Sequence, residues 1–198
     1  ESPRFTRLTR VSRIIAGLAG SIKLKSAAKA TRPTSDRVKE SVFAKLESMG
    51  AIEGARVLDL FAGTGALGLE AASRGATWVT LVEKDLGAAA VCAENLKAIH
   101  ASLQKQGQVC EFKLEKQDVK NYLVRNRSGF DLVFIDPPYD LSNEAVELLL
   151  AELGSSLNPE ALVVVERDSR SPELKFPEGL SLESRKIYGD TSVYFLEA

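Results

Sequence analysis

The stretch VLDLFAGTGALGLE, residues 57–70, decides the fold that we expect of this chain. It begins with apolar, strand-forming residues and continues with glycines in the spacing G-x-G-x-x-G, at Gly63, Gly65 and Gly68. Such glycines form a tight turn between a parallel strand and a helix, and they let a ligand approach the backbone at the helix N-terminus. Glu83 ends the next predicted strand, where an acid commonly binds a ribose. The stretch therefore predicts an α/β fold with a nucleotide-like ligand beside this loop.

Predicted strands and helices alternate on both sides of the glycine loop. The strands are expected at 55–61, 78–83, 109–115, 130–136 and 161–167, and the helices at 66–74, 86–103, 118–126 and 143–153. Two further strands, 180–188 and 192–198, meet near Gly189. Alternation of this kind gives a mostly parallel sheet with helices on both faces, and the last two strands add an antiparallel edge hairpin. We therefore predict a seven-stranded, mostly parallel sheet.

The N-terminal part of the chain differs from the rest in charge. Residues 1–45 contain 11 Lys and Arg residues against three Asp and Glu residues, although the whole chain has a net charge of −1. Segment 11–25 has two short apolar runs separated by glycines and predicts a β-hairpin, and a helix ending near Gly50 is expected after it. A basic segment on an acidic body is typical of a polyanion-binding arm, the alternative being a solvated tail. We place a basic extension at 1–50 and the main domain at 51–198.

Composition narrows the class of protein further. No apolar run is long enough to span a membrane and no signal-peptide core is present, so we expect a cytoplasmic location. Cys92 and Cys110 lack the spacing of a metal motif, and His100 is the single histidine. We therefore expect no metal site and no disulfide, two small buried cysteines, and a surface or capping role for His100.

Two ligand classes fit the glycine loop, a nicotinamide dinucleotide and S-adenosylmethionine. Asp59 lies four residues before Gly63, where its carboxylate would repel a pyrophosphate but tolerate a cationic sulfonium. Asp118, beyond the third strand, is placed to accept a hydrogen bond from an adenine amine. A turn that only packs a helix on a strand is the third interpretation, and the position of Glu83 argues against it. The pattern favours the methyl donor.

The stretch FDLVFIDPPYD, residues 130–140, ends a buried strand with Asp136, Pro137, Pro138 and Tyr139. An exocyclic amine of a nucleobase is a poor nucleophile, because its lone pair is delocalised into the ring. The Asp136 carboxylate and the Pro137 carbonyl can accept its two N–H groups and favour a pyramidal nitrogen. Tyr139 offers a face on which an extruded base can stack. An ordinary Asp-Pro-Pro turn is the alternative, but the position after a buried strand favours catalysis.

With these motifs in place, the chain resembles class I S-adenosylmethionine-dependent methyltransferases of the Asp-Pro-Pro-Tyr type. It resembles more closely the RsmD family of bacterial small-subunit ribosomal RNA guanine-N2 methyltransferases. The resemblance spans nearly the whole chain, and its segments are RIIAG (13–17), RPTSDRVKESVF (32–43), LDLFAGTGALGLEAASRGA (58–76), LVEKD (81–85) and FIDPPY (134–139). It implies a Rossmann-like fold and methyl transfer to a guanine N2 amine of 16S ribosomal RNA, with DNA or another RNA amine such as adenine N6 as the alternative.

The resemblance also implies the roles of individual residues. Asp136, Pro137, Pro138 and Tyr139 hold the target base. The donor, S-adenosylmethionine, is expected to contact Asp59, Phe61, Ala62, Gly63, Gly65, Gly68, Glu83, Lys84, Asp118 and Val119. The residues expected to bind RNA are Arg10, Arg13, Lys23, Arg32 and Arg37. Arg32, Thr34 and Arg37 match the family's N-terminal motif, and contact with the donor's carboxylate is the alternative to RNA phosphate for these three. The expected partner is ribosomal RNA within a partly assembled small subunit, bound by a monomer. A nicotinamide oxidoreductase and a non-catalytic RNA-binding protein with the same fold remain competing interpretations.

Overall fold

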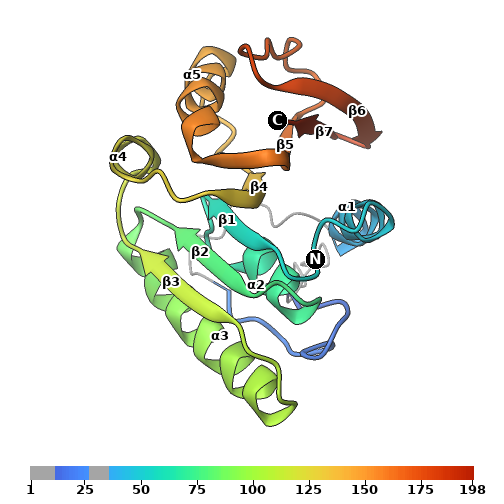
Figure 1. The fold of residues 1–198 in the computed structure, drawn as a ribbon, viewed down its shortest axis with the longest axis vertical. Helices are drawn as coiled ribbons and strands as arrows, with labels where there is room; N and C mark the ends of the chain where they lie inside the picture. The colour runs from blue at the N-terminus through green and yellow to red at the C-terminus, as the bar shows by residue number, and fades with distance from the viewer. Residues whose placement is uncertain (1–11, 27–35) are drawn as a thin grey trace, which may run out of the picture.

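The structure, a computed structural model, describes residues 12–26 and 36–198. Seven strands form one sheet in the order β3-β2-β1-β4-β5-β7-β6 (Figure 1). The strands β3, β2, β1, β4 and β5 are parallel to their neighbours in this order, whereas β7 runs antiparallel to both β5 and β6. The strands are β1 (Arg56–Leu60), β2 (Trp78–Val82), β3 (Glu111–Glu115), β4 (Phe130–Ile135), β5 (Leu157–Asp168), β6 (Ser181–Tyr188) and β7 (Thr191–Glu197). The predicted mostly parallel, seven-stranded sheet with an antiparallel C-terminal edge is confirmed.

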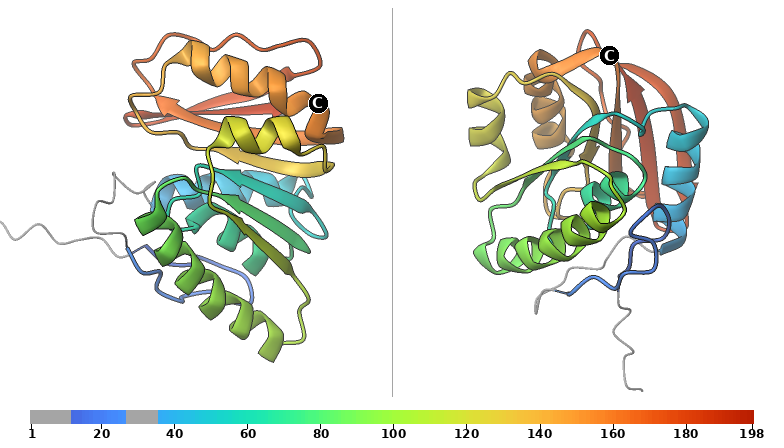
Figure 2. Two further views of the ribbon diagram at one scale, coloured as in Figure 1. Left: turned by 90° about the vertical axis from the view of Figure 1, so that its left-hand side faces the viewer. Right: turned by 60° about the horizontal axis from the view of Figure 1, so that its bottom comes forward.

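Helices cover both faces of this sheet (Figure 2). They are α1 (Asp36–Ser48), α2 (Ala66–Ser73), α3 (Leu86–Lys105), α4 (Val119–Arg125) and α5 (Asn143–Leu153), and the 3-10 turn η1 (Gly154–Ser156) follows α5. Apolar residues of α1, α2 and α3 pack in one hydrophobic cluster with one face of the sheet. Those of α4 and α5 pack in a second cluster with the other face. The sheet is therefore buried on both sides, which explains its long apolar runs.

Three boundaries differ from the predictions by two residues or more. Helix α3 continues to Lys105, because Gln104 and Lys105 are good helix formers and the left-handed residue Gly107 (φ +75°) follows only afterwards. Strand β3 begins at Glu111 and not at 109, since its partner β2 begins at Trp78 and offers nothing earlier to pair with. Strand β5 begins earlier than predicted and contains a bulge opposite β4.

The predicted β-hairpin at 11–25 is reduced to one antiparallel bridge, between Arg13 and Lys23. We call residues 12–26 the strap, because they cross helices α2 and α3. Instead of pairing with each other, several strap amides donate to side chains of these helices: Ile15 and Ala16 to Glu70, Ala19 to Ser73, and Lys25 to Asn95. The Ile14 N–H still donates to the Ile22 carbonyl and the Leu24 N–H to the Ser12 carbonyl, so distant side chains replace only part of the ladder that the apolar pattern predicts.

The N-terminal residues share their core with the rest of the chain. Ile14 and Leu24 of the strap and Phe43 of α1 are fully or almost fully buried in the cluster that also contains Val57 and Phe134 of the sheet. The Phe43 and Phe134 rings lie 5.5 Å apart. The domain boundary near residue 50 remains a prediction, but the described parts on either side of it pack as one body.

A buried ion-pair network joins the strap to α1 and α2. The Glu70 carboxylate is fully buried and accepts hydrogen bonds from the backbone of Ile15 (2.7 Å) and Ala16 (3.0 Å). It also lies 3.2 Å from Lys39 Nζ and 2.8 Å from Arg74 Nε. Burial lowers the pKa of the Lys39 amine, and its pairing with Glu70 opposes that shift. Charges without water need such complete pairing, so this network fixes how the strap sits on the domain.

Candidate active site

The glycine loop lies between β1 and α2 in a backbone conformation that few residues adopt. Phe61 has φ +64°, Gly63 φ +55° and Gly65 φ +87°. Gly68 serves packing instead, because a Cβ there would come within 2.6 Å of Leu81 Cδ2. The helix can therefore rest directly on the sheet, and its N-terminal backbone reaches the strand ends.

Two carboxylates predicted for the donor site hold this loop. Glu83 Oε2 accepts the Gly63 N–H at 2.8 Å, and its other oxygen accepts the Asp85 N–H at 2.7 Å. Asp59 Oδ2 accepts the Gly68 N–H at 2.8 Å. Each carboxylate oxygen has a second lone pair, so Glu83 retains acceptor capacity for a ligand hydroxyl.

The sheet register brings the two predicted motifs to the same edge. Leu60, the last residue of β1, pairs with Val82 of β2 on one side and with Ile135 of β4 on the other. Glu83 and Asp136 are the next residues along those strands, so they flank the glycine loop from the two sides. Adjacent strands lie about 4.8 Å apart, so the backbone of the corner that begins at Asp136 starts beside the glycine loop.

Electrostatics also indicates that these acids lie near one another. The Asp59 carboxyl is buried, and its pKa is raised to about 7, chiefly by desolvation, while the Gly68 N–H opposes the shift. The negative charges of Asp136 and Glu83 raise it further. Three acids around one loop disfavour a pyrophosphate and favour a ligand with positive charge.

The Asp59 shift predicts a pH dependence of stability. Its pKa rises from an ordinary 3.8 to about 7 in the folded protein, so its contribution is fully present below pH 4 and is lost as the pH rises through 7. We expect wild-type protein to lose stability relative to Asp59→Asn between about pH 4 and 7, by up to about 1.4 kcal/mol per pH unit, with little further loss above pH 7. Urea unfolding across this range measures the difference. The exposed Glu178→Gln serves as control, and parallel curves for wild type and Asp59→Asn would contradict the assignment.

The Asp136–Tyr139 corner presents groups of different exposure. Asp136 is half-buried and Pro137 buried, whereas Tyr139 has 60% of its surface exposed. The Leu141 N–H donates to the Pro138 carbonyl at 3.0 Å and closes the turn. The half-buried carboxylate and the exposed ring are therefore offered on one short segment, as recognition of an extruded base requires.

A buried arginine that the sequence did not single out supports this turn. Arg167, at the end of β5, donates to the Leu141 carbonyl at 2.7 Å and to Asn143 Oδ1 at 2.9 and 3.1 Å. Asn143 in turn donates to the Pro172 carbonyl at 2.7 Å. These contacts fix the segment that follows Tyr139 from the neighbouring strand.

The remaining predicted donor residues lie at the ends of β2 and β3. Asp118 caps α4 by accepting the Lys120 N–H at 2.9 Å, and its second oxygen is 3.9 Å from Lys84 Nζ. Ala62, in the loop after β1, and Val119, the first residue of α4, are buried and expose little surface. The structure thus brings Lys84 and Asp118 together beside Glu83, where the resemblance places an adenosine.

The predicted RNA-binding residues are only partly described. Arg10 and Arg32 lie outside the described residues. Arg13 and Lys23 form the bridge of the strap with exposed side chains, and Arg13 Nε lies 3.9 Å from Asp36 Oδ2. Arg37 is exposed on the first turn of α1. The described members therefore belong to the strap and α1.

Other features of the molecule are less suited to chemistry. Cys92 and Cys110 are buried, which raises the pKa of each thiol to about 12, and the His100 ring packs 5.4 Å from the Phe112 ring. Among residues 12–26 and 36–198, no three His, Cys, Asp or Glu side chains are grouped to hold a metal ion. None of the helices in this part of the chain has the length and apolar character to cross a membrane.

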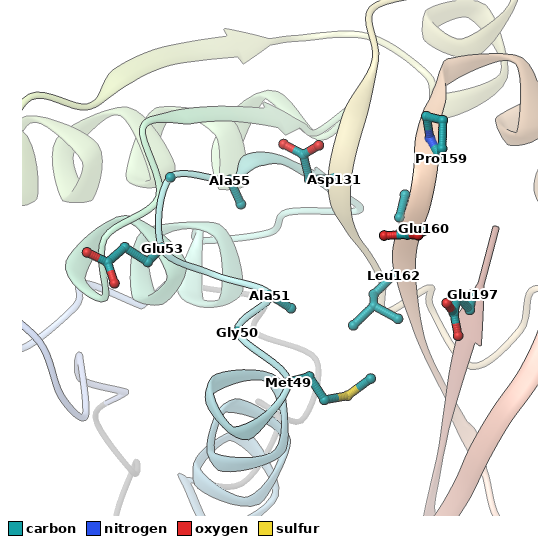
Figure 3. Close-up of a pocket in the computed structure, with 12 residues that line it drawn as sticks. Met49, Gly50, Ala51, Glu53, Ala55, Asp131, Pro159, Glu160, Leu162 and Glu197 are labelled. Atoms are coloured by element: carbon teal, nitrogen blue, oxygen red, sulfur yellow. The ribbon is translucent and has the colours of Figure 1, made fainter.

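A depression of about 490 Å³ lies at the amino ends of β1, β4 and β5, on the side of the sheet away from the glycine loop. Figure 3 shows Met49, Asp131 and Glu160 around it. Asp131 lies at the start of β4, and its carboxylate is already bonded to the Arg56 N–H and to Asn158. Ligands of open α/β sheets bind at the carboxyl ends of the strands, so this depression is not the candidate active site.

The strand order, the glycine loop after β1 and the acid after β2 define the Rossmann-like fold of class I methyltransferases. A solved structure of a hypothetical protein from Thermus thermophilus has this fold, with a TM-score of 0.77, 30% identity, and coverage of 95% of this chain and 100% of that one. Magnesium protoporphyrin IX methyltransferase from Synechocystis, solved with bound S-adenosylmethionine, shares the fold at 14% identity, with a TM-score of 0.60 and coverage of 81% and 78%.

Sequence comparison identifies the family within this class. The family model described as conserved hypothetical protein 95 matches residues 12–197. Ribosomal RNA small subunit methyltransferase D of Haemophilus influenzae is 38% identical over 91% of this chain and 90% of the relative. The protein of that name from Escherichia coli K12 is 34% identical over 81% and 76%. The chain belongs to the family of these small-subunit ribosomal RNA methyltransferases D, and the predicted resemblance to the RsmD family is confirmed.

Proposed function

We propose that this protein transfers a methyl group from S-adenosylmethionine to the N2 amine of a guanine in small-subunit ribosomal RNA. One observation carries the proposal: the Asp136–Tyr139 corner and the acid-lined glycine loop end adjacent, paired strands. An electrophilic donor and an amine acceptor can therefore meet at one edge of the sheet. The names of the Haemophilus influenzae and Escherichia coli relatives support ribosomal RNA as the substrate.

The residues present fit the donor. Three acids around a backbone loop with left-handed glycines suit a cationic ligand that approaches closely. Glu83 would bind the ribose hydroxyls, and Asp118, beside Lys84, would bind the adenine amine. When bound, S-adenosylmethionine supplies an electrophilic methyl group on a sulfonium.

The catalytic residues act on the acceptor. The Asp136 carboxylate and the Pro137 carbonyl would accept the two N–H groups of the guanine amine and aim its lone pair along the crevice. They stabilise the positive charge that develops on nitrogen as the N–C bond forms and the S–C bond breaks. One amine proton is then released beside Asp136. Tyr139, with its exposed ring, would stack on the base and keep it out of the RNA helix.

The substrate class follows from the basic N-terminal segment together with the relatives. Residues 1–45 carry an excess of eight positive charges, which suits contact with RNA phosphates. We infer that the strap and α1 carry part of this surface next to the crevice, that the protein acts as a monomer in the cytoplasm, and that the RNA is presented in a partly assembled small subunit.

Nucleoside mass spectrometry tests the proposal. We expect purified protein and labelled S-adenosylmethionine to produce N2-methylguanosine in ribosomal RNA or in small-subunit particles that lack this methylation. Duplex DNA and poly(A) are the controls. N6-methyladenine in either control would favour the alternative amine substrate, and NAD binding without S-adenosylmethionine binding would refute a methyltransferase.

A further inference from the structure

We infer that Asn95 is a positioning residue that fixes the glycine loop of the donor site to the strap. This inference rests on the proposed function. Asn95 lies in the middle of α3 with 3% of its surface exposed. Its Nδ2 donates to the Thr64 carbonyl at 3.0 Å and to the Lys25 carbonyl at 3.1 Å, and its Oδ1 accepts the Lys25 N–H at 2.8 Å. Both amide hydrogens and the oxygen are thus used.

The contact with Thr64 lies between Gly63 and Gly65, the two glycines of the loop with positive φ. Fixing the Thr64 carbonyl fixes the peptide plane that Thr64 shares with Gly65, whose N–H donates back to the Ala62 carbonyl at 2.7 Å. Gly65 also packs on α3, since a Cβ there would lie 3.0 Å from Cys92 Sγ. Helix α3 therefore holds the loop by packing at Cys92 and by a hydrogen bond one turn later at Asn95.

Asn95 thereby completes the attachment of the loop. Asp59 and Glu83 anchor its amides from the sheet, and Asn95 anchors a carbonyl from the helix side. An asparagine suits this position because it donates and accepts at once, whereas Asp offers no donor and Leu offers neither group. Without the Asn95 amide, the Thr64 carbonyl would lose its hydrogen bond, and the loop would no longer be held in the conformation that binds the donor.

The same side chain connects the loop to the N-terminal part of the chain. Lys25 is next to the end of the described strap, and its Nζ also pairs with Glu94 of α3 at 2.6 Å, whereas the strap's contacts with Glu70 and Ser73 are made with α2. Helices α2 and α3 both begin at the donor crevice. A single side chain therefore makes donor affinity depend on the docking of the segment that leads to the basic N-terminus.

Asn95→Asp and Asn95→Leu test the inference. We expect each to raise the KM for S-adenosylmethionine and the Kd for S-adenosylhomocysteine at least about tenfold, while kcat at saturating donor stays within about threefold. Ser73→Ala is the matched control: it removes two strap hydrogen bonds, from Ala19 N–H and to the Ala16 carbonyl, but contacts no residue of the loop. It should lower stability and leave donor affinity unchanged.

Hydrogen exchange on protein without donor gives a second readout. The Asn95 variants should exchange the amides of Gly63 and Gly65 faster than Ser73→Ala does at equal global stability. Wild-type donor affinity and wild-type exchange in a folded Asn95 variant would overturn the inference, as would equal loss of affinity in Ser73→Ala. If wild-type protein failed to bind S-adenosylhomocysteine, the proposed function would fall, and the exchange rates would still decide whether Asn95 fixes the loop.

Discussion

Asp136→Ala is expected to reduce methyl transfer about 10²–10³-fold, the cost typical of removing one preorganised group that stabilises developing charge. Asp136 follows β4 directly beside the glycine loop, where it also raises the pKa of Asp59. Without its carboxylate, the amine loses one of two acceptors and the charge that stabilises the forming cation. Single-turnover methylation of ribosomal RNA measures this loss.

The same variant should leave donor binding within about threefold of wild type, because we propose that the adenosine contacts are made by Glu83 and Asp118 and not by Asp136. Isothermal titration with S-adenosylhomocysteine provides this second number. Asp140→Asn, in the same turn but exposed, is the matched control and should retain its activity. An Asp136→Ala protein with near-normal turnover would refute the catalytic assignment and favour a purely structural turn.

Glu70→Ala should destabilise the folded protein by about 3–5 kcal/mol, as expected when one partner of a buried ion pair is removed. The substitution leaves the Lys39 amine in a buried position without its carboxylate and leaves the amides of Ile15 and Ala16 without an acceptor. Urea unfolding followed by circular dichroism gives the free energy of unfolding.

Two comparisons sharpen this prediction. Lys39→Met should cost less, because Glu70 keeps Arg74 and two backbone donors. Glu94→Gln removes an exposed partner of Lys25, 2.6 Å away, and should have little effect because water screens that pair. If Glu70→Ala and Glu94→Gln were equally stable, the buried network would contribute little to the fold.

Much of the fold and the main motifs could be predicted because their signals are local. Apolar strands alternating with helices specify the sheet, and G-x-G-x-x-G and Asp-Pro-Pro-Tyr each stand at a strand end. Parallel strand ends converge, so Glu83 and Asp136 could be placed together before their register was known. The roles of individual site residues remain predictions, although the structure gathers Asp59, Glu83, Asp118 and Asp136 around one crevice edge.

The strap and Asn95 could not be predicted, because their partners are distant in sequence. Ile15 donates to a carboxylate 55 residues away, and Lys25 to an amide 70 residues away. An apolar run interrupted by glycines looks like a hairpin when those acceptors are not considered. Asn95 gave one usable signal: it is polar at a position between Cys92 and Ile99 on the apolar face of its helix.

The long-range hydrogen bonds of the strap are made largely by its main chain, through the amides of Ile15, Ala16, Ala19 and Lys25, while Ile14 and Leu24 bury their side chains in the core. Every residue type except proline supplies the same amide. The exposed side chains at Arg13 and Lys23 can therefore change during evolution without loosening the attachment. Substitutions at Arg13 and Lys23 could therefore change the charge presented to a partner surface without altering the fold of the catalytic domain.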